Sequence, residues 1–228
     1  MLYGSHSSSI PQKTVIVVAQ TIVLAVAIWM LLAGGLDAIS GLLHVKWAHA
    51  VPLRGDLLSA AYCIVYLRIV LAMFYLLKRS LSWQEAIPIP VAFAVYYWGF
   101  TLLAGPVSAP VGATAYVGVA LFLIGSFLNT GGELLRDSWK KVPANHGKLY
   151  TGGLFRYSMH INYFGDVVWI IGLACLSGNP WSAIIPFMIF IFFAFYNAPL
   201  LDRHLAANYG KEFEEYKART KRLVPFIY

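Results

Sequence analysis

Six stretches of the chain are long and apolar enough to cross a bilayer, and they restrict the fold more than any other feature. About 20 residues of helix span the roughly 30 Å hydrocarbon core. Lipid offers no hydrogen-bond partner to the backbone, so each run is expected to be a helix. An all-α, multi-pass transmembrane bundle of about six spans is therefore predicted, with spans at 15–34, 57–77, 86–105, 112–130, 163–178 and 181–201.

Charged residues are scarce, which excludes an ordinary soluble domain. Of the 228 residues, 59% are hydrophobic and only 12% are charged, against roughly 25% charged in a soluble domain. Cys63 and Cys175 lie inside apolar runs, where cysteine serves as a small packing residue, so a disulfide scaffold is excluded. No Cys/His cluster has zinc-like spacing, and no metal site is expected. His44 and His49 flank Trp47 and form either a weak metal pair or, as we favour, part of an interfacial aromatic belt.

The basic residues predict the orientation. Lys and Arg number 17 against 10 Asp and Glu, and cytoplasmic loops of membrane proteins carry such an excess. With the N-terminus inside, 14 of the 17 face inward, Lys46 and Arg54 lie outside, and Arg68 falls within the second span. We therefore expect both termini in the cytoplasm, in a bacterial inner membrane or the endoplasmic reticulum, with the lipid bilayer and no nucleic acid as partner.

The chain is expected to contain one domain. The first apolar run is long enough to span and lacks a clear cleavage site, so it is interpreted as an uncleaved helix. Residues 1–12 are expected to be a disordered leader, and residues 13–228 a single integral membrane domain.

Polar side chains gather where three of the later spans meet the predicted inner surface. Asn129 and Glu133 are four residues apart and share a helix face; an amide and a carboxylate so placed suit ribose hydroxyls or a carboxamide. Because the polar segments lie on one side of the bilayer, they can converge on one large polar ligand. The remaining candidates follow in the chain as Lys140, Arg156, His160, Asn162, Tyr163, Asp166, Arg203, His204 and Tyr209.

The segments GGLFRYSMHINYFGD and DRHLAANYGKEFEEYKARTKRLVPFIY carry a family resemblance. From about Asn129 to Tyr228 the chain resembles the C-terminal half of the steroid 5-alpha-reductase, sterol reductase and isoprenylcysteine carboxyl methyltransferase superfamily. Its pattern is a glycine-led segment running into Arg-His-Pro-Asn-Tyr-x-Gly-Asp/Glu, then a helical hairpin and a basic, aromatic tail. The resemblance implies substrate-side helices at 15–110 and a cofactor-binding half at 111–228.

The reductase branch implies NADPH as the cofactor. By that resemblance Asn129, Glu133, Asn162, Tyr163 and Asp166 contact it, and Arg203, His204 and Tyr209 complete the pocket, to which we add Lys140, Arg156 and His160 from the same polar segments. The methyltransferase branch instead implies S-adenosylmethionine, held by the Arg-His-Pro-x-Tyr run and a later glutamate.

Asp166 bears on the choice between these branches, and two other residues depart from the pattern that both branches share. Asp166 favours the reductases, because the methyltransferases usually lack an acid after the glycine. Met159 stands where Arg is common and Ile161 where Pro is common, which removes a cation that could meet a phosphate or a carboxylate.

The first half of the chain lacks a convincing Gln-x-x-x-Glu with a partner tyrosine, the set that polarises the enone in 5-alpha-reductases. A reductase must still protonate or hydrogen-bond its substrate. Tyr66 and Tyr97 are the catalytic candidates, with Arg68 near enough to lower a phenol pKa; Tyr62 and Tyr96 are further possibilities. A core or interface role is the alternative for each tyrosine.

The sequence supports one leading function and two alternatives. The leading hypothesis is a membrane-embedded, NADPH-dependent reductase of a conjugated double bond in a lipid or steroid-like substrate. The first alternative is an S-adenosylmethionine-dependent methyltransferase of a lipid, prenylcysteine or small amine, which needs alignment more than acid–base groups. The second is a non-catalytic lipid-binding membrane protein.

Overall fold

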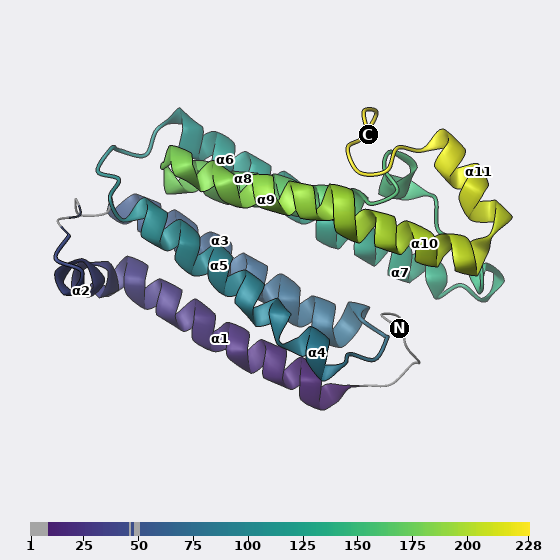
Figure 1. Cartoon of the computed structure of the whole chain (residues 1–228), viewed down its shortest axis with the longest axis horizontal. Helices are drawn as coiled ribbons and strands as arrows, with labels where there is room; N and C mark the ends of the chain where they lie inside the picture. The colour runs from purple at the N-terminus through teal and green to yellow at the C-terminus, as the bar shows by residue number, and fades with distance from the viewer. Residues whose placement is uncertain (1–8, 46, 48–50) are drawn as a thin grey trace. The chain divides into compact units, whose positions relative to one another are not determined.

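The computed structural model describes residues 9–45, 47 and 51–228, and helices are the only regular structure in these ranges (Figure 1). The all-α class is therefore confirmed. The chain divides into two compact units, one made of Met1–Val119 with Gly172–Ala183 and the other of Ala120–Ile171 with Ile184–Tyr228.

Most of the first unit is a group of long helices. Its elements are α1 (Ile10–Leu32), α2 (Gly35–Leu42), α3 (Pro52–Leu71), the π-helical η1 (Ala72–Leu76), α4 (Trp83–Ala86), α5 (Pro88–Ala104) and the short η5 (Pro180–Ala183).

The second unit holds the polar segments. Two helices, α6 (Ala113–Ser126) and α8 (Ile161–Ser177), cross the boundary between the units. The other elements of this unit are η2 (Phe127–Gly131), α7 (Gly132–Lys140), η3 (Pro143–Asn145), η4 (Gly153–Arg156), α9 (Ile184–Phe192), η6 (Phe193–Asn197), α10 (Ala198–Tyr209) and α11 (Lys211–Arg219).

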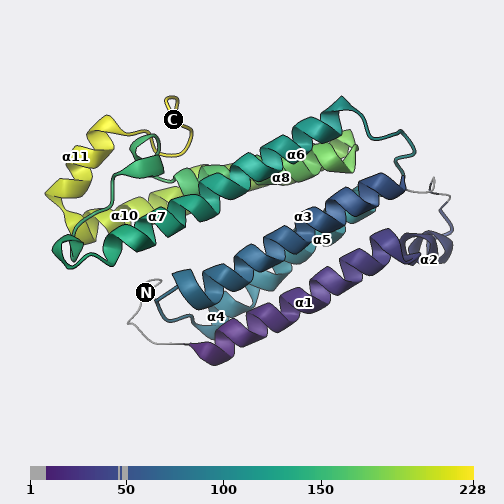
Figure 2. The same ribbon diagram turned by 180° about the vertical axis from the view of Figure 1, so that it is seen from behind.

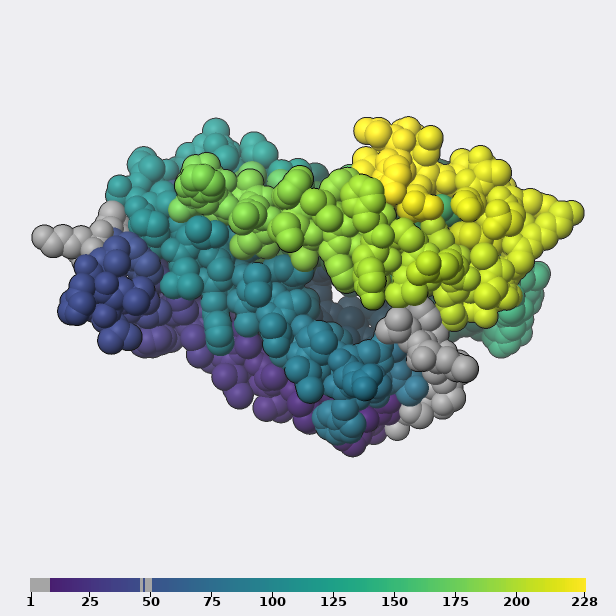
Figure 3. Space-filling view, viewed as in Figure 1, coloured from purple at the N-terminus to yellow at the C-terminus, as the bar shows by residue number. Residues whose placement is uncertain are grey.

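In residues 9–45, 47 and 51–228, five helical runs are long and apolar enough to cross a membrane, and the sixth predicted span is shorter. The predicted run 163–178 corresponds to α8, an apolar helix of 17 residues, or about 26 Å. The last run, of 30 residues, forms a continuous ridge in the space-filling view (Figure 3). The five long runs are Ile10–Leu32, Pro52–Leu76, Trp83–Ala104, Ala113–Lys140 and Pro180–Tyr209.

Helix α1 begins at Ile10, before the predicted end of the leader at residue 12. Residues 10–12 of the predicted leader 1–12 are helical, while residues 1–8 lie outside the described residues. Pro11 occupies the first turn, where its missing N–H costs nothing. Lys13 is one of the 14 basic residues that the sequence predicts to face the cytoplasm. In the structure it is buried, and its Nζ donates to the Leu77 carbonyl at 2.6 Å.

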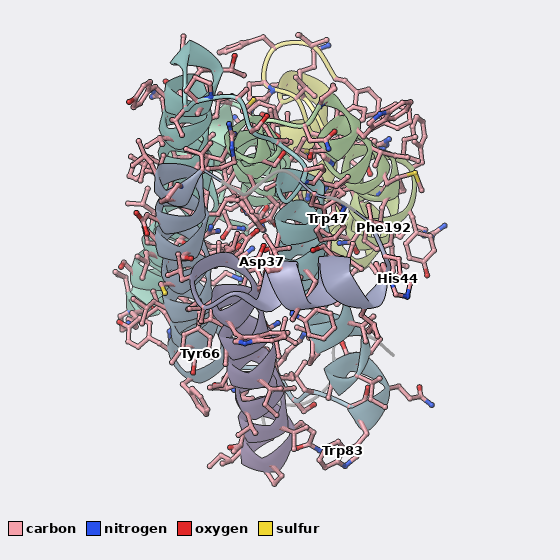
Figure 4. All side chains as sticks on the ribbon, turned by 90° about the vertical axis from the view of Figure 1, so that its left-hand side faces the viewer. Asp37, His44, Trp47, Tyr66, Trp83 and Phe192 are labelled. Carbon is pink, nitrogen blue, oxygen red and sulfur yellow. The ribbon has the colours of Figure 1, made fainter. Side chains whose placement is uncertain are left out.

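The chain turns sharply after α1. Gly34 has φ +78°, a conformation that glycine adopts without steric cost, and α2 lies across the end of α1 (Figure 4). His44 and Trp47 follow α2 in that view. His49, the other member of the histidine pair, lies outside the described residues.

Arg54 is a buried helix cap. Its side chain donates to the carbonyls of Leu176 at 2.8 Å and of Ala109 at 2.9 Å, and the residue is only 4% exposed. Leu176 lies in the last turn of α8, where carbonyls lack helical partners and a cation is favoured by the helix dipole. Arg54 was expected to be an external charge that marks topology, but it ties α3 to the end of α8.

Two glycines let α6 and α8 approach closely in the second unit. A Cβ at Gly165 would lie 2.6 Å from the Asn129 amide nitrogen and 2.8 Å from the Gly125 carbonyl oxygen. Figures 1 and 2 both show the two helices side by side. The glycine of the Asn-Tyr-x-Gly run therefore sets the distance between η2 and the start of α8.

Gly165→Ala is expected to destabilise the protein, because the atoms that the new methyl group meets belong to the backbone. We expect roughly 1–3 kcal/mol lower free energy of unfolding, as for overpacking of a core, measured by thermal or denaturant unfolding in one detergent. The control is Gly41→Ala in α2, where a Cβ meets nothing within 4 Å; it should leave stability unchanged or slightly raised. Equal effects of the two substitutions would contradict the close approach.

Candidate functional site

A small pocket opens among the polar segments of the second unit. It has a volume of about 60 Å³, and two cations, several rings and an amide face it. Its lining residues are Arg136, Lys140, Leu149, Tyr150, Phe155, Met159, His160, Asn162, Leu201, Leu205, Tyr209 and Tyr216.

Asn162 joins two helices beside this pocket. The Asn129 side chain donates to the Asn162 carbonyl at 3.2 Å, and the Asn162 side chain donates to Glu133 Oε1 at 2.9 Å. The other carboxylate oxygen of Glu133 accepts from Arg136. Asn129 lies in the π-helical turn η2, a feature often found at functional sites. The predicted pair Asn129 and Glu133 thus meets Asn162 in one network.

His160 and Asp202 form a buried pair at the pocket wall. His160 is 1% exposed and its Nε2 lies 2.8 Å from Asp202 Oδ1. Arg222 Nε donates to Asp202 Oδ2 at 2.8 Å, and Arg222 Nη1 donates to the Tyr228 hydroxyl at 3.1 Å. Burial lowers the pKa of Arg222, but these hydrogen bonds and the charge of Asp202 outweigh it and raise the pKa overall. The guanidinium therefore stays charged and holds the Asp202 carboxylate in place.

The segment after α11 clamps the residues that lead into α8. The amides of Met159 and His160 donate to the carbonyls of Lys221 at 2.8 Å and Arg222 at 3.0 Å. The Ser158 hydroxyl donates to the Leu223 carbonyl at 2.8 Å. Residues far apart in the chain thus fix the backbone of His160.

Aromatic rings form the rest of the wall. The Tyr216 hydroxyl donates to the Phe155 carbonyl at 2.5 Å, and burial raises its pKa, so it remains a neutral phenol. The ring centroid of Tyr150 lies 5.6 Å from that of Phe155. Met159 packs with Phe213 and Tyr216 in a hydrophobic cluster, which explains an apolar side chain where the resemblance leads one to expect a cation.

The cofactor-binding candidates that line the pocket are Lys140, His160, Asn162 and Tyr209. Asn129 and Glu133 lie beside it, and three further candidates also lie outside its lining. Arg156 is exposed and bonds the Tyr157 hydroxyl. Arg203 is exposed on α10, and His204 Nε2 lies 2.8 Å from the Asn208 amide.

Tyr163 and Asp166 of α8 also lie outside the pocket lining. The ring of Tyr163 stacks between His160 and Phe193, with centroid distances of 5.4 and 4.7 Å. Asp166 Oδ1 accepts from Trp169 Nε1 at 2.8 Å. Tyr163 therefore packs against the ring of His160, and Asp166 accepts a hydrogen bond from a residue of its own helix.

The catalytic candidates Tyr66, Arg68 and Tyr97 belong to the first unit. The Tyr66 hydroxyl lies 2.9 Å from Thr21 Oγ1, and Figure 4 labels Tyr66 on the side of α3. Tyr97 is fully buried and stacks on Tyr62 at 4.7 Å. Tyr97 therefore has a core position in this unit.

Sequence reasoning overlooked Asp202 and Arg222. Asp202 was passed over for its neighbours Arg203 and His204, yet the helical spacing of Ala198, Asp202 and Leu205 places the carboxylate on the inward face. No local pattern in the sequence identifies Arg222 as its partner.

Gln20 is a further residue that the sequence did not single out. It is fully buried in α1, and neither its amide nitrogen nor its oxygen has a hydrogen-bond partner among the described residues, a state that is rare in native proteins.

The comparisons with known proteins give one family and two kinds of relative. The model of the family described as "Protein of unknown function (DUF1295)" matches residues 64–220. The chain is 32% identical over 112 residues to pig 3-oxo-5-alpha-steroid 4-dehydrogenase 2, and 31% identical over 112 residues to the human protein of that name. It is 28% identical over 116 residues to Protein-S-isoprenylcysteine O-methyltransferase B of Arabidopsis thaliana.

These matches cover part of each protein. The pig match spans 49% of this chain and 42% of the pig protein, and the human match has the same shares. The Arabidopsis match spans 48% of this chain and 58% of that protein. Both kinds of relative therefore resemble about half of this chain.

Asp202→Asn is expected to lower the free energy of unfolding by about 1–3 kcal/mol, because the buried His160 and the partly exposed Arg222 lose a charged acceptor. The control is Glu215→Gln, since Glu215 pairs with Lys211 at 3.7 Å with both side chains exposed. Such surface pairs contribute roughly 0–1 kcal/mol. Unfolding in detergent, followed by tryptophan fluorescence, measures both; equal losses would contradict a structural role for the pair.

Proposed function

The chain belongs to the DUF1295 family, and on this basis we propose that it is a membrane enzyme that binds NADPH and reduces a conjugated double bond in a lipophilic substrate. The observation that carries the proposal is the Asn129–Asn162–Glu133 network beside a pocket lined by Arg136 and Lys140. The relatives named 3-oxo-5-alpha-steroid 4-dehydrogenase support the reductase branch.

The chemistry of the pocket suits a dinucleotide. Arg136 and Lys140 can neutralise phosphate oxygens, while the Asn162 amide in the lining and the Glu133 carboxylate beside it match hydroxyl and carboxamide groups. Tyr150 and Tyr209 offer ring faces for a base.

The size of the pocket adds a requirement. Its volume of about 60 Å³ is below the roughly 300–1,000 Å³ of clefts that hold small molecules. NADPH binding therefore requires rim side chains to move apart, beginning with the exposed Lys140.

The residues of this chain would bind and orient the reactants. NADPH, when bound, supplies a hydride to the double bond. The Asn162 side chain holds Glu133 at the start of α7 while Asn129 holds the Asn162 backbone, and Asp202 holds His160 at the wall, so both polar groups are fixed before a ligand arrives. A proton donor is also needed, and Tyr66, Arg68 and Tyr97 remain the predicted candidates for that role.

The bilayer would supply the substrate. Large apolar side chains cover the outer faces of the spanning helices, among them Phe187, Phe192 and Phe195, so a lipophilic molecule can reach the protein without leaving the membrane.

We infer that both termini face the cytoplasm, where NADPH is available, in a bacterial inner membrane or the endoplasmic reticulum. Lys13 and Arg54 are buried and bonded within the first unit, so they say little about topology. Without them, the predicted topology still assigns 13 basic residues to the inner side and Lys46 alone to the outer side, so the expected asymmetry persists.

The second candidate function is methyl transfer from S-adenosylmethionine to a lipid, a prenylcysteine or a small amine. It is favoured by the match to a plant Protein-S-isoprenylcysteine O-methyltransferase over 48% of this chain. Methyl transfer depends mainly on alignment of the reactants, and the carboxylate of Glu133 offers a partner to the ammonium group of that cofactor.

Calorimetric titration of the protein in lipid nanodiscs with NADPH and with S-adenosylmethionine tests the proposal. We expect saturable binding of NADPH alone, and Asn162→Ala should weaken it at least about tenfold, or 1.4 kcal/mol. The control is Asn208→Ala, an exposed amide on α10 outside the pocket lining. Binding of the methyl donor alone would establish the second candidate, and binding of neither would contradict an enzymatic role.

Lys140→Met is expected to weaken NADPH binding by about tenfold at low salt, because it removes a pocket cation from a polyanionic ligand. The difference from the unaltered protein should narrow as ionic strength rises, since salt screens exposed charges. Lys148→Met, an exposed lysine outside the pocket lining, is the matched control. A salt-independent loss would argue against a charge contact with the cofactor.

A further inference from the structure

Residues 224–228 form a closed loop that presents two apolar side chains outward. The amides of Leu223 and Val224 both donate to the Tyr228 carbonyl at 2.7 Å. Phe226 has φ +67°, a left-handed conformation that is unfavourable for a bulky residue. Phe226 is 77% exposed and Ile227 is 76% exposed. The folded loop therefore has a strained backbone at Phe226 and leaves the side chains of Phe226 and Ile227 largely exposed.

This loop lies beside the apolar part of the last spanning run. The Tyr228 hydroxyl donates to the Ala194 carbonyl at 3.4 Å, and Ala194 lies near the middle of the run Pro180–Tyr209. The next Asp, Glu, Lys, Arg or His on that run is Asp202, about 12 Å further along the helix. Figures 1 and 2 show the chain folding back from α11 toward the junction of α9 and α10. The loop is thus level with residues expected in hydrocarbon.

Cations and aromatic rings surround the loop. The Arg156 guanidinium lies 4.6 Å from the ring centroid of Tyr157, which in turn lies 5.8 Å from that of Phe226. Residues 216–228 contain four Lys or Arg and no Asp or Glu, and Lys221 is exposed. Aromatic rings with long basic side chains are typical of the boundary between acyl chains and headgroups.

We propose that residues 224–228 are an interfacial anchor that enters the leaflet beside α9 and α10. Phe226 and Ile227 contact acyl chains, and Arg156 and Lys221 contact the anionic headgroups above them. The partner is the bilayer itself, because the loop is level with the apolar run, its exposed tip is apolar and its surroundings are basic.

The anchor is also connected to the pocket. Residues 221–223, which lead into the loop, accept the hydrogen bonds that fix Ser158, Met159 and His160. Insertion of the loop therefore holds the backbone of His160 at the pocket wall. This second step rests on the proposed function, whereas the insertion itself does not.

A spin label at Ile227→Cys, in a Cys63→Ala and Cys175→Ala background, tests insertion. The protein is placed in nanodiscs of phosphatidylcholine and phosphatidylglycerol, and collisions of the label with oxygen and with a water-soluble nickel complex are compared. We expect oxygen collisions to exceed nickel collisions several-fold at position 227. The control is Glu214→Cys on α11, an exposed site where nickel collisions should dominate. An aqueous signal at 227, or protection from both reagents as in a contact between subunits, would overturn the proposal.

The connection to the pocket is tested with Phe226→Glu, which should keep the loop out of the leaflet. We expect NADPH affinity in nanodiscs to fall several-fold with an unchanged unfolding midpoint in detergent, and Phe226→Leu should restore it. If the label at 227 reports insertion but affinity is unchanged, insertion stands and the connection is overturned. If the unaltered protein does not bind NADPH, the proposed function fails while the labelling result still decides insertion.

Discussion

The main physical constraint on this structure is that its buried polar groups have lost their hydrogen bonds to water. A polar or charged side chain that leaves water must find a partner inside the protein, and the chain meets this demand with contacts between distant segments. Arg54 donates hydrogen bonds to two carbonyls, one of them in the last turn of α8, and the Asp202 carboxylate pairs with both His160 and Arg222. Gln20, whose amide has no partner within the described part of the chain, is an exception that water or the polar group of a ligand would satisfy.

The polar groups of the candidate site also find their partners inside the protein. Its polar groups come from the junction of η2 and α7, the start of α8, the inward face of α10 and the segment after α11. The small residues Gly125 and Gly165 bring two of these helices close enough for Asn129 to reach Asn162. The apolar environment thus supports a pre-arranged set of polar groups, which is what binding of a cofactor requires.

The spanning helices were predictable from the sequence because hydrocarbon leaves the backbone no other choice. The network of Asn129, Glu133 and Asn162 was partly predictable, because residues four apart share a helix face. Asp202 was not predicted as a site residue, because the side of α10 that faces inward depends on the elements against which α10 packs. The buried roles of Lys13 and Arg54 were also missed, because a count of charges in loops cannot tell a solvated cation from one that is bonded to carbonyls.

The amino-acid sequence alone determined that the chain is a helical membrane protein with polar segments at helix ends, because apolar length and helical spacing are local properties. Only the tertiary structure decided which polar side chains meet, because the pairs His160–Asp202 and Asp202–Arg222 join residues 42 and 20 positions apart. It also decided that Phe226 and Ile227 remain uncovered, since that depends on how the chain folds back after α11. Long-range contacts of this kind follow from close packing, and they produce no periodic pattern in the sequence from which they could be predicted.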